Sequence, residues 1–207
     1  MGETARRPRV VGVFGSSCAP SGSSTYEVAR RLGCAVTREG WVLVNGGCGG
    51  AMAGSARGAK EAGGQTQGVT LAAYGPRVNR WIDQTTVADT LWSRQETMAR
   101  SADAFVALPG GTGTLHEVAA VWELLNKGFL RDKALVLLGH FWRPLVGMMC
   151  PTGRARAWRS GQAGLARNVA EAVALLRERL AGPASRRGAS RRGWSGSCAG
   201  SRDPGRT

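Results

Sequence analysis

The sequence predicts an α/β protein: a Rossmann-like, doubly wound parallel sheet with helices on both faces, in a single domain. Short apolar runs alternate along the chain with helical patterns, and glycines separate the two. Because the apolar runs are continuous, both faces of each strand are expected to be covered, as in parallel sheets. A chain of 207 residues with 43% hydrophobic residues is long enough for one buried core and too short for two large domains.

The expected elements follow the order of these runs. Strands are predicted at residues 9–14, 41–45, 66–71, 104–108 and 133–138. Helices are predicted at about 25–39, 51–62, 91–102, from near Thr114 onward, and at 169–180. Asn168, with Glu171 three residues later, forms a capping pattern ahead of the last helix.

Two connections lack a strand pattern. A long polar connection containing Pro76 is expected between the third strand and the helix at 91–102. The stretch Cys150–Gly164 lacks the apolar strand that is expected before the last helix. The sheet is therefore either one strand short at its edge or poorly ordered in that region.

Composition limits the classes of function. The formal net charge is +14, and most of the excess lies after residue 150. We expect a flexible N-terminus at 1–8, one domain at 9–182 and a disordered Arg/Gly/Ser-rich tail at 183–207. The tail is either a solvated segment or a nucleic-acid-binding element that holds phosphates.

Five scattered cysteines and two histidines support neither a disulfide framework nor a metal site, which favours the reduced cytoplasm. Neither a signal peptide nor a membrane span is predicted.

Three glycine-rich loops each follow a predicted strand: GSSCAPSGSS, NGGCGGAM and PGGTGT. Loops at the carboxyl ends of parallel strands meet at one edge, and each is followed by a helix N-terminus. Backbone N–H groups without a Cβ in the way suit a phosphate. The alternative is that the glycines only make tight turns.

Common phosphate-binding signatures are absent. PGGTGT is followed by Leu115 and His116, so it is not a Walker A loop. Met52 stands where a dinucleotide-binding loop needs its third glycine, and no acidic residue follows the third strand. A Schiff-base lysine for pyridoxal phosphate is not indicated either, because Lys60 and Lys127 fit solvent-facing helix positions and Lys133 begins a strand. The sequence therefore favours a phosphorylated ligand and no organic cofactor.

PGGTGTLHE matches the signature P-G-G-x-G-T-x-x-E, and the chain resembles the LOG ("Lonely Guy") family, once labelled possible lysine decarboxylases. The likeness spans Val10 to about Val146 and includes VGVFGSS, NGGCGGAM, KEAGGQTQGV and WSRQETM. The resemblance implies a Rossmann-like fold, a homodimer with active sites near the subunit interface, and no metal or organic cofactor. It also implies hydrolysis of cytokinin and adenosine 5'-monophosphates to free base and ribose 5-phosphate, with Arg94 and Glu117 as the catalytic residues.

The residues themselves leave several roles open. Arg94 has no acidic neighbour on its helix, so it binds a ligand, is solvated or pairs with a distant acid. Glu117 either completes a capping box with Thr114 or stabilises positive charge on the ribose. His116 either contacts the base or phosphate or is simply exposed. The expected substrate-binding residues are Gly15, Ser16, Gly46, Gly47, Gly49, Gly50, Met52, Pro109, Gly110, Gly111, Thr112, Gly113 and Thr114.

Three hypotheses for function follow. The first is N-glycosidic hydrolysis of adenosine-type nucleoside 5'-monophosphates. The second is a carrier of a nucleotide or of the molybdenum cofactor that performs no catalysis, and the third is nucleic-acid binding through the tail. Gln95, Thr112 and His116 depart from the LOG family's usual residues, which leaves the preferred base open.

Overall fold

A computed structural model describes residues 7–75, 78–150 and 156–181, and its central feature is a seven-stranded sheet. The strand order is β4-β3-β2-β1-β5-β6-β7, and every neighbouring pair is parallel. The strands are β1 (Val10–Phe14), β2 (Val42–Asn45), β3 (Thr66–Leu71), β4 (Gln84–Ala88), β5 (Ala104–Ala107), β6 (Ala134–Leu138) and β7 (Ala163–Ala166). The predicted doubly wound fold is confirmed: successive strands are added on one side of β1 up to β4, and from β5 onward on its other side.

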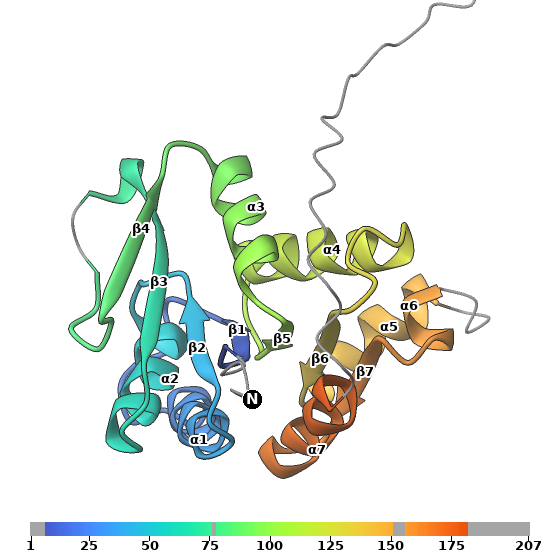
Figure 1. Ribbon diagram of the computed structural model, residues 1–207, viewed down its shortest axis with the longest axis horizontal. Helices are drawn as coiled ribbons and strands as arrows, with labels where there is room; N and C mark the ends of the chain where they lie inside the picture. Colours follow the sequence, from blue (N-terminus) through green and yellow to red (C-terminus); the bar gives the residue numbers. More distant parts are fainter. Residues whose placement is uncertain (1–6, 76–77, 151–155, 182–207) are drawn as a thin grey trace, which may run out of the picture.

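Helices cover both faces of the sheet (Figure 1). One face carries α1 (Ser24–Arg38), α2 (Gly50–Glu61) and α7 (Val169–Leu180). The other carries α3 (Leu91–Ser101), α4 (Thr112–Asn126), α5 (Arg143–Met149) and α6 (Arg156–Arg159). Short 3-10 turns lie at Ala72–Tyr74 and His140–Trp142. Among the described residues, no helix is both long and apolar enough to cross a membrane.

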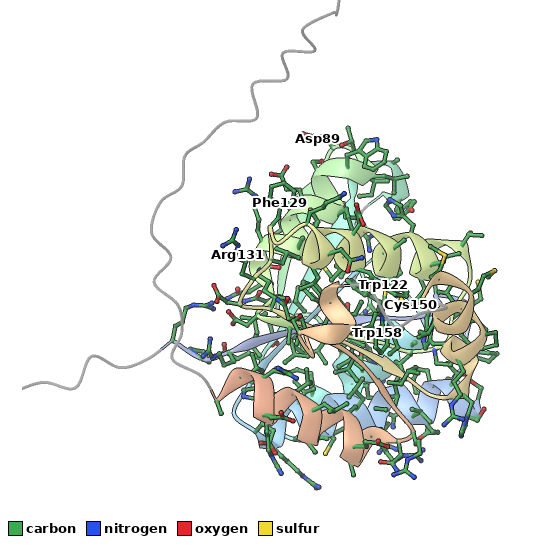
Figure 2. The ribbon with its side chains drawn as sticks, turned by 90° about the vertical axis from the view of Figure 1, so that its right-hand side faces the viewer. Asp89, Trp122, Phe129, Arg131, Cys150 and Trp158 are labelled. Carbon is green, nitrogen blue, oxygen red and sulfur yellow. The ribbon has the colours of Figure 1, made fainter. Side chains whose placement is uncertain are left out.

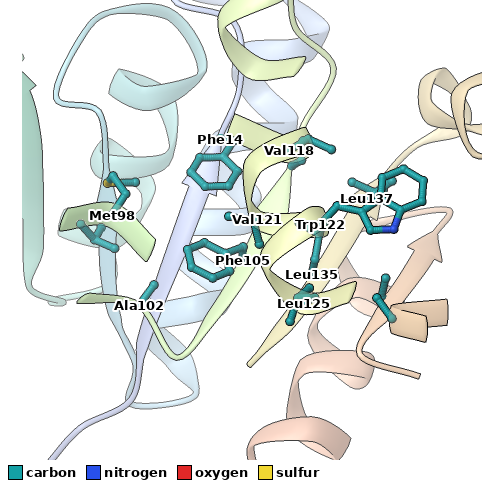
Figure 3. Close-up of a cluster of buried hydrophobic side chains, with 14 of the residues drawn as sticks. Phe14, Met98, Ala102, Phe105, Val118, Val121, Trp122, Leu125, Leu135 and Leu137 are labelled. Atoms are coloured by element: carbon teal, nitrogen blue, oxygen red, sulfur yellow. The ribbon is translucent and has the colours of Figure 1, made fainter. Parts of the chain in front are cut away.

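The central strands are buried on both sides, which explains their continuous apolar sequences. Phe14 and Phe105 point toward α3 and α4, where their rings stack with centroids 5.5 Å apart (Figure 3). Val13 and Val106, the neighbouring residues on the same strands, pack against α1 and α7 on the opposite face. The sheet therefore separates two apolar cores.

Two edge strands correct the sequence-based expectations. β4 lies inside the expected polar connection, and its first four residues are exposed, so it lacks the apolar pattern of a core strand. β7 pairs with β6 through Ala163–Ala166, so the expectation of a sheet that is one strand short is wrong. The segment 151–155, the first residues of the N-terminus and the predicted tail at 183–207 lie outside the described residues.

Side chains fix the ends of two helices that flank the sheet. The Asn168 side chain accepts a hydrogen bond from the Glu171 N–H at 3.0 Å, which confirms the predicted cap of α7. At the C-terminus of α3, the Lys133 ammonium donates to the carbonyl oxygens of Ala99, Arg100 and Ala102. A cation at this position complements the helix dipole and joins α3 to the start of β6.

Helices α1 and α2 touch through their backbones. A Cβ added to Gly33 would lie 1.9 Å from the Ser55 carbonyl oxygen, and one added to Gly58 would lie 1.8 Å from the Arg30 carbonyl oxygen. No side chain fits at either position. The two glycines therefore set the distance between α1 and α2.

Gly33→Ala is expected to lower the free energy of unfolding by about 1–3 kcal/mol or more, because the added methyl group must push the two helix backbones apart. Urea denaturation measures the change. Gly147→Ala is the matched control, because Gly147 lies in α5 with open space around its would-be Cβ. An equal effect of the two substitutions would contradict this account of the α1–α2 contact.

Candidate active site

The three predicted glycine loops meet at Ser16, beyond the carboxyl ends of the strands. The Ser16 N–H donates to the Pro109 carbonyl oxygen at 3.4 Å, and the Ala51 N–H donates to the Ser16 carbonyl oxygen at 2.8 Å. The loops after β1, β2 and β5 are therefore joined through one residue. The contact between the loops after β1 and β5 lies where the strand order changes direction, which is the usual ligand position in such sheets.

The glycines in these loops meet two different needs. A Cβ on Gly110 would lie 2.2 Å from the Thr114 Oγ1 atom and 3.0 Å from the Ser16 nitrogen, and one on Gly50 would lie 2.2 Å from the Ser16 carbonyl oxygen. These glycines let the loops approach each other. Gly111 and Gly113 instead have open space around their would-be Cβ atoms, so they expose backbone to a ligand.

Helix α4 begins earlier than the sequence suggests. Its N-cap is Gly111, without a side-chain cap, and the helix starts at Thr112. Thr114 is therefore not the N-cap, and the predicted capping box between Thr114 and Glu117 is wrong. The N–H groups of the first turn have no carbonyl partner within the helix, so they are available to an anion.

Arg94 and Glu117 form a buried ion pair beside these loops. The Arg94 Nη1 atom lies 3.1 Å from the Glu117 Oε1 atom, and each residue is only 8% exposed. The Arg94 Nε–H also donates to the Val69 carbonyl oxygen at 2.8 Å. Of the alternatives for Arg94, the distant acid is the one observed, and that acid is Glu117. The structure thus brings together the two residues that the family resemblance implies.

Gly46 makes room for this pair. A Cβ at Gly46 would lie 2.1 Å from the Arg94 Nη2 atom and 2.8 Å from the Met52 sulfur. The guanidinium therefore lies directly against the loop after β2. This loop, α3 and α4 all contribute to one small region.

The pair has an unusual electrostatic environment. Burial raises the pKa of the Glu117 carboxyl above its ordinary value, and the charge and hydrogen bond of Arg94 partly offset this rise. Burial also raises the pKa of the nearby Cys48 thiol, again opposed by Arg94. A buried carboxyl with a raised pKa beside a fixed cation is common at functional sites.

Two asparagines that the sequence reading did not single out hold the loop after β2. The Asn45 side chain accepts from the Gly47 N–H at 2.8 Å and donates to the Met52 carbonyl oxygen at 2.9 Å. The Asn79 side chain donates to the carbonyl oxygens of Gly47 and Cys48 at 3.0 and 2.9 Å. Asn45 directly precedes a glycine pair, a turn signal that could have identified it. Asn79 lies in a connection that has no such signal.

The other predicted site residues occupy structural or peripheral positions. Gly15 packs against Ala51 and Leu108, and Gly47 adopts a positive φ of 72°. A Cβ on Gly49 would lie 3.4 Å from the Ser17 carbonyl oxygen. Thr112 is exposed in the first turn of α4. His116 is half-buried, and its ring meets the Trp92 ring edge-on with centroids 5.7 Å apart.

The structure has two cavities that neither Arg94 nor Glu117 lines. The larger, about 650 Å³, lies between the starts of α1 and α7 on the other face of the sheet. The second, about 440 Å³, is a groove between α4 and α5 that includes Trp122 and Cys150 (Figure 2). We call it the α4–α5 groove. No cluster of potential metal ligands is present in the described part of the chain.

The fold and the joined loops define a Rossmann-like protein with three glycine-rich loops at the carboxyl edge of its sheet. The chain belongs to the SLOG cluster4 family, whose model matches residues 8–135. This membership confirms the resemblance to the LOG proteins that the sequence indicated.

Individual relatives agree with this assignment. A Mycobacterium tuberculosis protein named cytokinin riboside 5'-monophosphate phosphoribohydrolase is 36% identical over 133 residues, which cover 60% of this chain and 70% of the relative. A protein of the same name from Rhodococcoides fascians is 31% identical over 164 residues, 72% of this chain and 82% of the relative. Among solved structures, the molybdenum cofactor carrier protein from Chlamydomonas reinhardtii has a TM-score of 0.67 and 28% identity, covering 85% of this chain and 100% of the carrier.

Proposed function

We propose that the protein is a phosphoribohydrolase that cleaves the N-glycosidic bond of adenosine-type nucleoside 5'-monophosphates and releases free base and ribose 5-phosphate. The buried Arg94–Glu117 pair beside three joined glycine loops is the observation that carries this proposal. The names of relatives that align with most of the domain support it. The reaction needs no cofactor.

The phosphate is placed on the first turn of α4 and the loop before it. The N–H groups of Gly110, Gly111, Gly113 and Thr114 would donate to its oxygens, and the helix dipole would favour its charge. Two anions repel each other, so the Glu117 carboxylate faces the ribose instead. We assign the remaining substrate contacts to Gly15, Ser16, Gly46, Gly47, Gly49, Gly50, Met52, Pro109 and Thr112.

The chemistry follows from this placement. When the bond between C1' and the base nitrogen breaks, its electron pair leaves with the base, which takes up a proton from solvent, and C1' becomes positively charged. The Glu117 carboxylate stabilises that charge. Water then adds to C1', and its released proton passes to solvent through the carboxylate. Arg94 holds the carboxylate in place and favours its ionised form.

Glu117→Gln is expected to reduce kcat at least about a hundredfold, because the amide cannot stabilise positive charge on C1'. The amide oxygen still accepts from Arg94, so a stability loss of about 2 kcal/mol is expected and the fold is retained. Chromatographic detection of free base and ribose 5-phosphate measures turnover. Glu96→Gln, at an exposed acid of α3, is the control. Near-normal turnover by Glu117→Gln would show that the carboxylate is not catalytic.

The raised pKa of Glu117 also predicts the pH dependence of activity. The reaction needs the ionised carboxylate, so kcat/KM is expected to fall with decreasing pH around a midpoint above about 4.3, the ordinary glutamate value. Arg94 lowers this pKa, and Arg94→Gln should therefore move the midpoint to higher pH. Initial rates across a pH series test both statements. A midpoint that Arg94→Gln leaves unmoved, or moves to lower pH, would contradict them.

We propose a homodimer that forms through helices near the site. The apolar residues Trp122 and Leu125 of α4 are buried within the chain's own core, and Leu124 is half-buried. Exposed apolar side chains lie around the α4–α5 groove: Leu115 and Met149 line it, and Met148 precedes Met149 in the chain. A second copy of the chain is the occupant that we assign to this surface.

Met149→Glu is expected to convert a dimer into a monomer, because the charge would be buried at the interface. Light scattering at micromolar concentration gives the mass. Phe129→Glu is a control at another exposed apolar residue, which lies away from Cys150 in Figure 2. A monomeric mass for the unmodified protein would rule out the dimer.

A carrier that performs no catalysis is the second candidate, favoured by the likeness to the molybdenum cofactor carrier over 85% of the chain. Calorimetric binding of a phosphorylated ligand without turnover would support it.

Nucleic-acid binding is a third candidate that rests on the tail at 183–207, which lies outside the described residues. Deletion of that tail should abolish salt-sensitive binding if this candidate is correct. We propose a cytoplasmic location, in which cysteines such as the four described ones, which are free thiols, stay reduced.

A further inference from the structure

An aromatic pair joins the same two helices as the ion pair. The rings of Trp92 and His116 meet at an angle of 72° with centroids 5.7 Å apart. Trp92 belongs to the first turn of α3, two residues before Arg94, and His116 directly precedes Glu117 on α4. Each helix therefore contributes one charged and one aromatic residue to the same part of the molecule.

Trp92 is held in place without being covered. It is 76% exposed and belongs to neither apolar core, although tryptophan normally buries most of its ring. The contact with His116 orients the indole edge-to-face, an arrangement that leaves much of its ring surface free. A large flat apolar surface that is oriented but uncovered suits a flat aromatic ligand.

The position of this surface matches the remaining part of the proposed substrate, so the inference rests on the proposed function. The phosphate lies at the N-terminus of α4 and the ribose lies at Glu117. The base is attached to the ribose at C1', the carbon that Glu117 faces. Trp92 and His116 join the N-terminal parts of the same two helices, α3 and α4, so they offer the aromatic surface that a base extending from C1' toward solvent would meet.

We propose that Trp92 and His116 form the platform for the substrate's base, with the base stacked on the free face of the indole and the imidazole fixing the angle of that indole. Both residues determine specificity. They favour a planar aromatic base over a non-aromatic leaving group, and a larger purine ring system over a pyrimidine. Stacking is sequence-tolerant among bases because every base has a π-face, so size rather than hydrogen bonding sets the preference.

Base-dependent binding tests the proposal directly. Calorimetry would compare AMP with ribose 5-phosphate, which lacks the base. Trp92→Ala is expected to weaken AMP binding by about 10- to 100-fold, the range typical of losing one base–aromatic stack, and to leave ribose 5-phosphate binding unchanged. Trp92→Phe should retain most of the affinity for AMP. Phe129→Ala, at a residue that is also 76% exposed, is the matched control.

Tryptophan emission gives an independent signal. AMP should quench part of the emission of the unmodified protein, and this part should disappear in Trp92→Phe even though AMP still binds. His116→Ala should reduce both the quenching and the affinity for AMP. Ribose 5-phosphate should produce no such quenching in any variant.

Two results would overturn the platform. One is unchanged AMP affinity in Trp92→Ala. The other is an equal loss for AMP and ribose 5-phosphate, which would mean that Trp92 supports the fold or packs against a second copy. Failure of the proposed function gives a different result. If the unmodified protein binds AMP with base-dependent quenching but releases no free base, the platform proposal stands and the hydrolase proposal is wrong.

Discussion

The buried ion pair between Arg94 and Glu117 constrains the whole carboxyl edge of the sheet. Two charges removed from water are tolerated only when each is well satisfied, and here the guanidinium also donates to the Val69 carbonyl oxygen. The pair needs α3 and α4 at a fixed separation and a residue without a Cβ at Gly46. The contacts that satisfy these two charges are also the contacts that assemble the site. Loss of either charge therefore affects both the stability of the fold and the geometry of the site.

The loops around this pair use their polar groups in two ways. Side chains of Asn45 and Asn79 satisfy backbone groups of the loop after β2, and Ser16 joins the neighbouring loops through its own backbone. The start of α4, in contrast, has no side-chain cap. Backbone groups that elsewhere are satisfied within the protein are here directed outward, which is the arrangement that an anionic ligand requires.

Local patterns predicted the fold well wherever burial dictated the residue types. The strands β1, β2, β3, β5 and β6 are buried, and their apolar runs identified them. The edge strand β4 is largely exposed and begins with three polar residues, and β7 has three small residues and a single leucine, so neither showed a hydrophobic pattern. The helix start at Thr112 was missed because Thr-x-x-Glu imitates a capping box. The Arg94–Glu117 contact joins residues far apart in sequence, and only the family resemblance had suggested that they act together.

The backbone contact between α1 and α2 has a consequence for how the ligand site can adapt. These helices follow directly from the loops after β1 and β2, and Gly33 and Gly58 hold them at a distance set by carbonyl oxygens rather than by compressible side chains. Those two loops must therefore shift together or not at all. Helices α3 and α4 meet through side chains, and outside the Arg94–Glu117 pair these can be exchanged for larger or smaller ones. Substitutions that adapt this architecture to new ligands are therefore expected on the α3–α4 side of the site, while the α1–α2 side stays unchanged.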